Sequence, residues 1–492
     1  MANISFETFA LRGSVLNLLG RITGRVLFLL SQALLARLMT PFQFGLYAIG
    51  WNIFRTLGLF APLGLDAGVI HFGMRYKLKD SSLLKTFIFL VTLLGVLSGV
   101  TFGGLWFAGA DQLAQWLHKT SMTIFFRLFA VALPMYVALR ILSAATRISK
   151  NMIYTVLAEE VVPGMVNIGA IWVLVGLAKW VPGSVLALAL SFFGGAWLSW
   201  IFVVQLYSVS WHGLGKILKG VKSLLRFSFS VMIGSGLGSL FFLMDRLFVG
   251  YFLPPDTVGR YQTAALLTAL FVHLLASLKV AMAPLVSEAV RQEDYAGLER
   301  TYTNTTRWLL IVVSPLVLLL LLAPRDIMVF GFGQNYAGAE QIMLILLAGQ
   351  LLNLLTGVVD ILLIMSGNPG EWVKVMLFSM GINVILQVVL IPKWGAQGAA
   401  WATAASLGLA SLGGGWKVYR VLGIHPLDIH YLRVVSLLAV GGFAVTTINT
   451  FSSPLWLKGS LLSCSLAILG YALWRYGLKK QEQLALLTVL RR

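Results

Sequence analysis

Long apolar segments dominate this sequence and restrict what it can fold into. A bilayer's hydrocarbon core needs about 20 apolar residues per helix, and the sequence contains about fourteen such segments between short polar breaks. The segments are continuous blocks that lack the alternation of a transmembrane β-barrel. We therefore predict an all-α polytopic membrane protein. The expected helices cover residues 13–39, 42–70, 83–108, 122–143, 153–178, 183–209, 226–252, 258–283, 305–323, 341–366, 371–392, 395–421, 431–450 and 454–476.

Composition and motif content exclude several other classes. Of the 492 residues, 58% are hydrophobic and only 11% are charged, which is far from the balance of a soluble domain. The single cysteine, Cys464, cannot form an intramolecular disulfide or a cysteine-based metal site. No G-x-x-x-x-G-K-[ST] sequence is present, so the chain has no P-loop for ATP hydrolysis. The glycine-rich run 234–238 lies inside an apolar segment, where close helix packing explains it better than a nucleotide loop.

The positive charge of the chain follows the expected topology. A net charge of +19 would suit nucleic acid, but the basic residues form no continuous basic domain, so we expect no nucleic-acid partner. About 24 of the 37 Lys and Arg fall on the side of the N-terminus, and the positive-inside rule then places both termini in the cytoplasm. We expect an uncleaved first helix. The cytoplasmic clusters are Arg75, Lys77, Lys79 and Lys85; Arg140, Arg147 and Lys150; Lys216, Lys219, Lys222 and Arg226; and Lys479, Lys480, Arg491 and Arg492.

A short motif occurs twice and suggests two lobes. Residues 41–47 read P-F-Q-F-G-L-Y and residues 255–261 read P-D-T-V-G-R-Y, so both match P-x-x-[FV]-G-x-Y. We interpret each copy as a turn between two apolar helices. An even number of predicted helices separates the copies, so they share one membrane orientation, as in the parallel repeats of some transporters. Chance recurrence of turn residues is the alternative.

The repeat and the polar segments divide the chain as follows. We expect an N-terminal lobe over residues 1–209, a basic cytoplasmic linker over 210–225, a C-terminal lobe over 226–421, and helices 13 and 14 with a basic tail over 422–492. Residues 284–304 are too polar to span the membrane and are typical of a surface helix. No soluble domain longer than about 20 residues is expected, which argues against an enzyme with its own catalytic domain.

Arginines inside the first two apolar segments are the leading candidates for a binding site. Arg25 and Arg55 are each about 15 residues from the first motif, which places both roughly 22 Å from it along their helices. Arginine at such a depth costs at least ~2.5 kcal/mol and usually faces a watery cavity or a partner. Arg21 shares a helix face with Arg25. We favour an anion site, because guanidinium groups bind phosphate bidentately, over a structural network that includes Asp66.

The second half of the chain has its own ionisable residues within apolar segments. Asp245 is a candidate proton or cation site together with Asn383 and Gln387, since a carboxylate in a dry bundle changes protonation or binds a cation. Partnership of Asp245 with an arginine is the alternative. Lys279 either faces the cavity or extends its amine to the cytoplasmic interface. The remaining residues of this kind are Arg246, which we regard as a structural ion partner, and Asp360, a further coupling candidate.

Five longer segments stand out: LLARLMTPFQFGLYAIGWNIFRTLGLFAPLGLDAGVIHFGMRY (34–76), MDRLFVGYFLPPDTVGRYQTA (244–264), APLVSEAVRQEDYAGL (283–298), FGFGQNYAGA (330–339) and WGAQGAAWATAAS (394–406). These segments resemble polysaccharide-biosynthesis flippases, the bacterial exporters of lipid-linked oligosaccharides (O-antigen type). They follow the order expected for that family over nearly the whole chain. The wider superfamily also holds lipid II flippases and multidrug and toxin extruders.

This resemblance implies a fold of two six-helix lobes in a V around a central cavity, which opens alternately to the two sides of the membrane. In the lipid II branch, arginines on helices one, two and eight hold the substrate's diphosphate. Arg21, Arg25, Arg55 and Lys279 fall on those helices here. The same branch has a sodium site between helices seven and eleven, to which Asp245 and Asn383 correspond, although the helix-eleven carboxylate is missing.

The sequence thus predicts a flippase for undecaprenyl-diphosphate-linked oligosaccharide in the bacterial inner membrane. It needs no cofactor, and H⁺ or Na⁺ is the candidate coupling ion. Membrane lipids, a polysaccharide polymerase and assembly proteins are the expected partners. A cation-coupled multidrug antiporter of the same architecture is the first alternative, and its cavity should favour carboxylates over arginines. A membrane-embedded glycan polymerase or ligase is the second.

Overall fold

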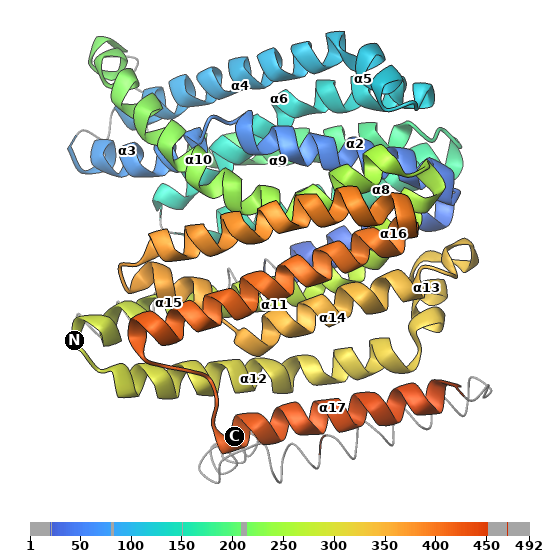
Figure 1. Ribbon diagram of the computed structural model, residues 1–492. Coiled ribbons are helices and arrows are strands. Elements are labelled where there is room, and N and C mark those ends of the chain that lie inside the picture. Colours follow the sequence, from blue (N-terminus) through green and yellow to red (C-terminus); the bar gives the residue numbers. More distant parts are fainter. Residues whose placement is uncertain are drawn as a thin grey trace, which may run out of the picture. The chain divides into compact units, whose positions relative to one another are not determined.

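The computed structural model describes residues 20, 22–79, 83–149, 151–207, 214–450 and 470 (Figure 1). Every regular element in these residues is a helix, so the all-α prediction is confirmed. Contacts divide the chain into two compact units, Met1–Gly259 and Arg260–Arg492. The lobe and linker boundaries predicted above remain predictions, although residues 214–225 are helical.

The first motif begins a helix and is not a turn. Residues 22–38 are helical, and after two further residues α2 runs over Pro41–Phe60. The Thr40 side chain accepts a hydrogen bond from the Gln43 backbone N–H (3.3 Å), and the Gln43 side chain accepts one from the Thr40 N–H (3.1 Å). This reciprocal cap, with proline in the first helical position, starts a helix at Pro41. The prediction of a turn over residues 41–47 was therefore wrong, because the reversal occurs before Pro41.

The second predicted helix is broken into two. α2 ends at Phe60 and α3 covers Leu65–Lys79, with Leu63 (φ 52°) and Gly64 (φ 69°) in left-handed conformations between them. The Ser98 hydroxyl donates to the freed carbonyl of Ala61 at 2.8 Å. A Cβ on Gly64 would lie 2.1 Å from the carbonyl oxygen of Ser228. The break places Asp66 in the first turn of α3.

α6 forms the centre of the first unit. It contacts α2, α3, α4 and α9, and Figure 1 shows α4, α6 and α9 side by side. Between α7 and α8 the chain forms a π-helical turn, η4, which carries Glu159 and Glu160. The bounds are α4 Leu84–Ala108, α5 Ala110–Trp116, α6 Thr123–Thr146, α7 Met152–Val156, η4 Leu157–Val161, α8 Val162–Ile171, η5 Trp172–Leu177, α9 Gly183–Leu206 and α10 Leu214–Phe252.

The second unit contains two interrupted helices. α14 and α15 meet at a 41° bend beside Gly357 (φ 69°), and α16 reverses at Gly395, whose φ of 57° and ψ of −134° are not helical. α12 packs against α17. The bounds are α11 Pro255–Arg291, α12 Tyr295–Leu322, α13 Pro324–Phe332, α14 Glu340–Thr356, α15 Val359–Met365, α16 Pro369–Leu422 and α17 Ile429–Thr450.

The predicted surface helix over residues 284–304 is not a separate element. α11 continues to Arg291 and α12 starts at Tyr295, so the segment forms the adjoining ends of these two helices. Glu293 has a positive φ of 57°, and the Asp294 side chain caps α12 by accepting from the Gly297 N–H at 2.8 Å. This cap breaks the polar segment in two.

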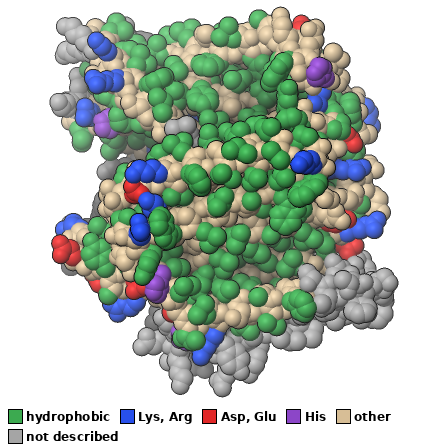
Figure 2. All heavy atoms as spheres, viewed as in Figure 1, with side chains coloured by type: hydrophobic (Ala, Val, Ile, Leu, Met, Phe, Trp, Pro, Cys, Tyr) green, Lys and Arg blue, Asp and Glu red, His purple; other side chains and the backbone are tan. Residues whose placement is uncertain are grey.

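The described residues contain nine helices long and apolar enough to cross a membrane, or ten if α14 and α15 form one span. The predicted count of fourteen is not confirmed, and the last predicted helix, 454–476, lies almost wholly outside the described residues. Large apolar side chains such as Leu97 and Phe378 are exposed, at 54% and 65%. Figure 2 shows hydrophobic side chains over the middle of the visible face and charged ones towards its two ends, the pattern of a membrane-embedded surface.

Candidate functional site

The first unit carries charged side chains that act on one another from three of its helices. Arg25 lies on the first helix and Arg55 on α2, and both side chains are exposed rather than packed in the core. The charges of Arg25 and Arg246 act on Arg55, as does the carboxylate of Asp245. α10, which carries Asp245 and Arg246, packs against α2. The four residues form a cluster with three positive charges and one negative charge, which we call the cationic cluster.

The members of the cationic cluster differ in burial. Asp245 is 7% exposed, whereas Arg246 is half-buried. Adjacent residues on a helix point about 100° apart, so Asp245 and Arg246 lie on different faces of α10. Both nevertheless influence Arg55, because α10 lies beside α2. Arg21, the third arginine of the predicted anion site, lies outside the described residues.

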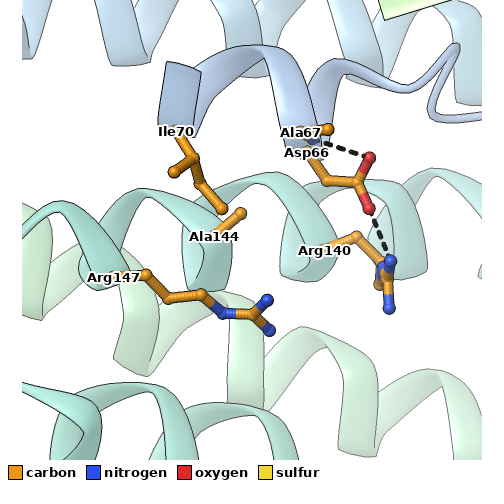
Figure 3. Close-up of a pocket in the computed structure, with 6 residues that line it drawn as sticks. All are labelled: Asp66, Ala67, Ile70, Arg140, Ala144 and Arg147. Atoms are coloured by element: carbon orange, nitrogen blue, oxygen red, sulfur yellow. Dashed lines mark hydrogen bonds and ion pairs between the residues drawn. The ribbon is translucent and has the colours of Figure 1, made fainter. Parts of the chain in front are cut away.

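Asp66 pairs with an arginine that the sequence analysis treated as a topology signal. Its carboxylate accepts a hydrogen bond from Arg140 on α6 at 2.5 Å. Glu159 of η4 bridges two arginines, with one oxygen 3.6 Å from Arg140 and the other 2.5 Å from Arg147. Figure 3 shows the cavity beside this network, about 140 Å³ in volume and lined by Asp66, Ala67, Ile70, Arg140, Ala144 and Arg147.

The sequence analysis missed this network, although one signal for it was present. Arg140 and Arg147 are seven residues apart and therefore lie on one face near the end of α6. Glu160, next to Glu159, lies against Gly24 of the first helix, where a Cβ would come 2.0 Å from its Oε2 atom. Two neighbouring glutamates thus reach two different basic helices.

In the second unit, two predicted site residues pair with each other. Lys279 of α11 donates to Asp360 of α15 at 2.8 Å, and both side chains are largely buried. Asp360 lies in the first turn of α15, directly after the bend at Gly357. A further arginine, Arg307 of α12, is fully buried, and the sequence analysis did not single it out.

The predicted coupling residues on α16 are both buried and bonded across its reversal. The Asn383 amide donates to the Ser406 hydroxyl at 2.6 Å, and the Gln387 amide donates to the Thr403 hydroxyl at 3.2 Å. Both contacts join the two halves of α16. Among the described residues, no group of three or more His, Cys, Asp or Glu side chains is placed to hold a metal ion.

Comparison with known proteins gives the family. A family model described as "Polysaccharide biosynthesis protein" matches residues 34–341, more than half of the chain. The chain belongs to the polysaccharide biosynthesis protein family. This family member is 26% identical over 260 residues to a probable low-salt glycan biosynthesis flippase of Haloferax volcanii, over 51% of this chain and 55% of that protein. It is also 26% identical over 186 residues to an uncharacterized membrane protein of Methanocaldococcus jannaschii, over 38% and 37% of the two chains.

Solved structures show which fold this polysaccharide biosynthesis protein has. A lipid II flippase in an inward closed conformation matches 94% of this chain and 99% of its own, with a TM-score of 0.73 and 11% identity. An inward-facing multidrug transporter of the MATE family matches 81% of this chain and 94% of its own, with a TM-score of 0.68 and 15% identity. Both likenesses show that the chain has the fold that these two transporters share. In sequence, the chain spans about half or less of the length of the two curated relatives it matches.

Proposed function

We propose that this protein is a flippase that moves undecaprenyl-diphosphate-linked oligosaccharide repeat units from the cytoplasmic to the periplasmic leaflet. The proposal combines its family, the transporter fold and the glycan flippase among its relatives. A diphosphate cannot leave water for hydrocarbon unaided. A cationic cavity that opens alternately to the two sides would bind the diphosphate while the polyprenyl chain stays in lipid.

The single observation that carries the proposal is the cationic cluster. The charges of Arg25 and Arg246 both act on Arg55, and the Asp245 carboxylate acts on it in the opposite sense. Arginine is the residue best suited to hold a diphosphate, because its planar group donates two parallel hydrogen bonds to phosphate oxygens. We assign diphosphate binding to Arg25 and Arg55, together with Arg21 and Lys279.

The main competing function is a cation-coupled multidrug antiporter, because a multidrug transporter shares the fold. A site for cationic drugs needs an excess of carboxylates, and the cationic cluster has an excess of arginine. The sign of the charge therefore favours an anionic substrate. A glycan polymerase or ligase is disfavoured because the relatives of known role are named as flippases and transporters.

Asp245 is our candidate for coupling transport to H⁺ or Na⁺. It is buried on α10 and its carboxylate acts on Arg55, so a proton or cation bound to Asp245 would change the field at the diphosphate. Asn383, Gln387 and Asp360 remain further coupling candidates on the second unit. We place the protein in the inner membrane with both termini in the cytoplasm, next to a polysaccharide polymerase and assembly proteins.

A reconstituted assay tests the proposed function. Purified protein is placed in liposomes that carry a fluorescent polyprenyl-diphosphate-linked oligosaccharide, and the fraction accessible to an external quencher is followed. We expect protein-dependent flipping that a polyprenyl glycan without a diphosphate does not undergo. Proton-driven uptake of cationic drugs with no flipping would favour the antiporter instead, and covalent change of the glycan would favour the enzyme.

A further inference from the structure

Two arginines of the first unit share one carboxylate beside a cavity. Glu159 places one oxygen 2.5 Å from Arg147 and the other 3.6 Å from Arg140. A phosphate group presents the same pair of oxygens to two guanidinium groups, with additional oxygens and more negative charge. The geometry that Glu159 occupies is therefore one that a phosphate fits.

The two guanidinium groups retain unused donors. Each carries five N–H groups, and among the described residues Arg140 donates one hydrogen bond to Asp66 and Arg147 donates one to Glu159. Both side chains are about one-third exposed, at 39% and 34%. In Figure 3 the Arg147 side chain extends towards the Arg140 side chain, and the cavity that both line, about 140 Å³, holds a group of several heavy atoms.

The surrounding charge also favours binding of an anion when the Glu159 side chain is displaced from the two arginines. Without Glu159, the local charges are Arg140, Arg147 and Asp66, and the Lys77 amine lies nearby because it donates to the Ile148 carbonyl at 2.9 Å. Three cations then face one carboxylate. Glu159 itself lies on the π-helical turn η4, a rare geometry that occurs frequently at functional sites.

We propose that Arg140 and Arg147 form a second phosphate-binding site, which Glu159 occupies as an internal counter-ion until a ligand replaces it. The ligand is a phosphate group carried by a lipid. It comes either from the diphosphate of the transported molecule or from the headgroup of a membrane phospholipid. The site uses none of the residues of the cationic cluster, so the proposal does not rest on the role proposed for Arg25 and Arg55.

The test measures binding of inorganic pyrophosphate to the full-length protein in nanodiscs of phosphatidylcholine. All measurements are made on an Arg55→Gln background, which weakens binding at the cationic cluster. We expect Arg147→Gln to weaken the binding of pyrophosphate at least about tenfold, because the substitution removes one of the two guanidinium groups. We expect Glu159→Gln to raise the affinity for pyrophosphate about tenfold, because the competing carboxylate is gone.

Arg127→Gln is the matched control. Arg127 lies at the other end of α6 in an exposed pair with Asp111, at 2.8 Å. Its replacement should therefore leave the binding of pyrophosphate unchanged. The gain expected in Glu159→Gln cannot arise from misfolding, so it protects the test against an unstable Arg147 variant. Equal affinities in Arg147→Gln and Arg127→Gln, or no gain in Glu159→Gln, would overturn the proposal. Its failure leaves the liposome assay of flipping untouched.

Further additions identify the source of the phosphate. If the site binds phospholipid, adding phosphatidylglycerol to the nanodiscs should weaken the binding of pyrophosphate to the parent protein but not to Arg147→Gln. If it binds the transported diphosphate, phosphatidylglycerol should have no effect, and a short-chain polyprenyl diphosphate should displace pyrophosphate. Both results support the site. Competition that is identical in the parent and in Arg147→Gln would contradict it.

Discussion

Gly45 lies directly against the carbonyl of Pro255, where a Cβ would come 1.6 Å from the oxygen. The contact is reciprocal, since a Cβ on Gly259 would lie 2.3 Å from the carbonyl oxygen of Pro41. The two glycines occupy the same position in the two copies of the repeated motif, and each copy begins a helix. The repeat is therefore a self-complementary packing contact between two helix starts, which glycine alone permits.

We predict that Gly45→Ala and Gly259→Ala each destabilise the protein by about 1–3 kcal/mol, because the added methyl group forces the two backbones apart. Thermal unfolding in detergent should show the loss for either variant. Gly104→Ala on α4 is the control, since a Cβ there meets nothing within 4 Å. That variant should be neutral or more stable, because alanine is the better helix former. Wild-type stability in Gly45→Ala would contradict the packing contact.

We predict that Lys279 and Asp360 are energetically coupled. Asp360→Ala leaves the largely buried Lys279 amine without its partner, so this variant should be less stable than the Lys279→Ala/Asp360→Ala double variant. A double-mutant cycle in thermal unfolding measures the coupling, which should exceed about 0.5 kcal/mol. The exposed pair Arg291–Glu288 is the comparison and should contribute less. Additive effects of Lys279 and Asp360 would refute the prediction.

We predict that Asp245→Asn loses its response to an ion gradient while it folds normally. An asparagine neither binds a proton nor attracts a cation, so the field at Arg55 no longer changes with ion binding. Flipping in liposomes should be compared with and without an imposed H⁺ or Na⁺ gradient. Asp111→Asn, which removes an exposed carboxylate on α5, should keep the wild-type response. An unchanged gradient response in Asp245→Asn would exclude Asp245 as the coupling residue.

The sequence was sufficient for the fold class because membrane helices follow a local rule. Each needs about 20 apolar residues, and this rule can be read without knowing any tertiary contact. The break between α2 and α3 could not be predicted from that rule. It depends on the Ser98 hydroxyl that bonds Ala61 and on the close approach of Ser228 to Gly64, which are both contacts between distant segments.

The candidate site was predictable to a similar extent. The spacing of Arg25 and Arg55 from the first motif indicated one depth, and their charges do interact in the structure. The partner of Asp66 was not predictable, because Arg140 lies 74 residues away and reaches it only through the packing of α3 on α6. Which of the many arginines pairs with a given carboxylate depends on the three-dimensional arrangement, which no local pattern in the sequence contains.

The most direct test of the central claim is the flipping rate of the Arg25→Gln/Arg55→Gln variant. It should be measured in liposomes with a fluorescent polyprenyl-diphosphate-linked oligosaccharide, beside wild type and the Arg127→Gln control. Losing two charge-assisted contacts to the diphosphate should lower the rate at least about a hundredfold, whereas Arg127→Gln should flip at the wild-type rate. A folded Arg25→Gln/Arg55→Gln protein that flips the glycan as fast as wild type would contradict the account.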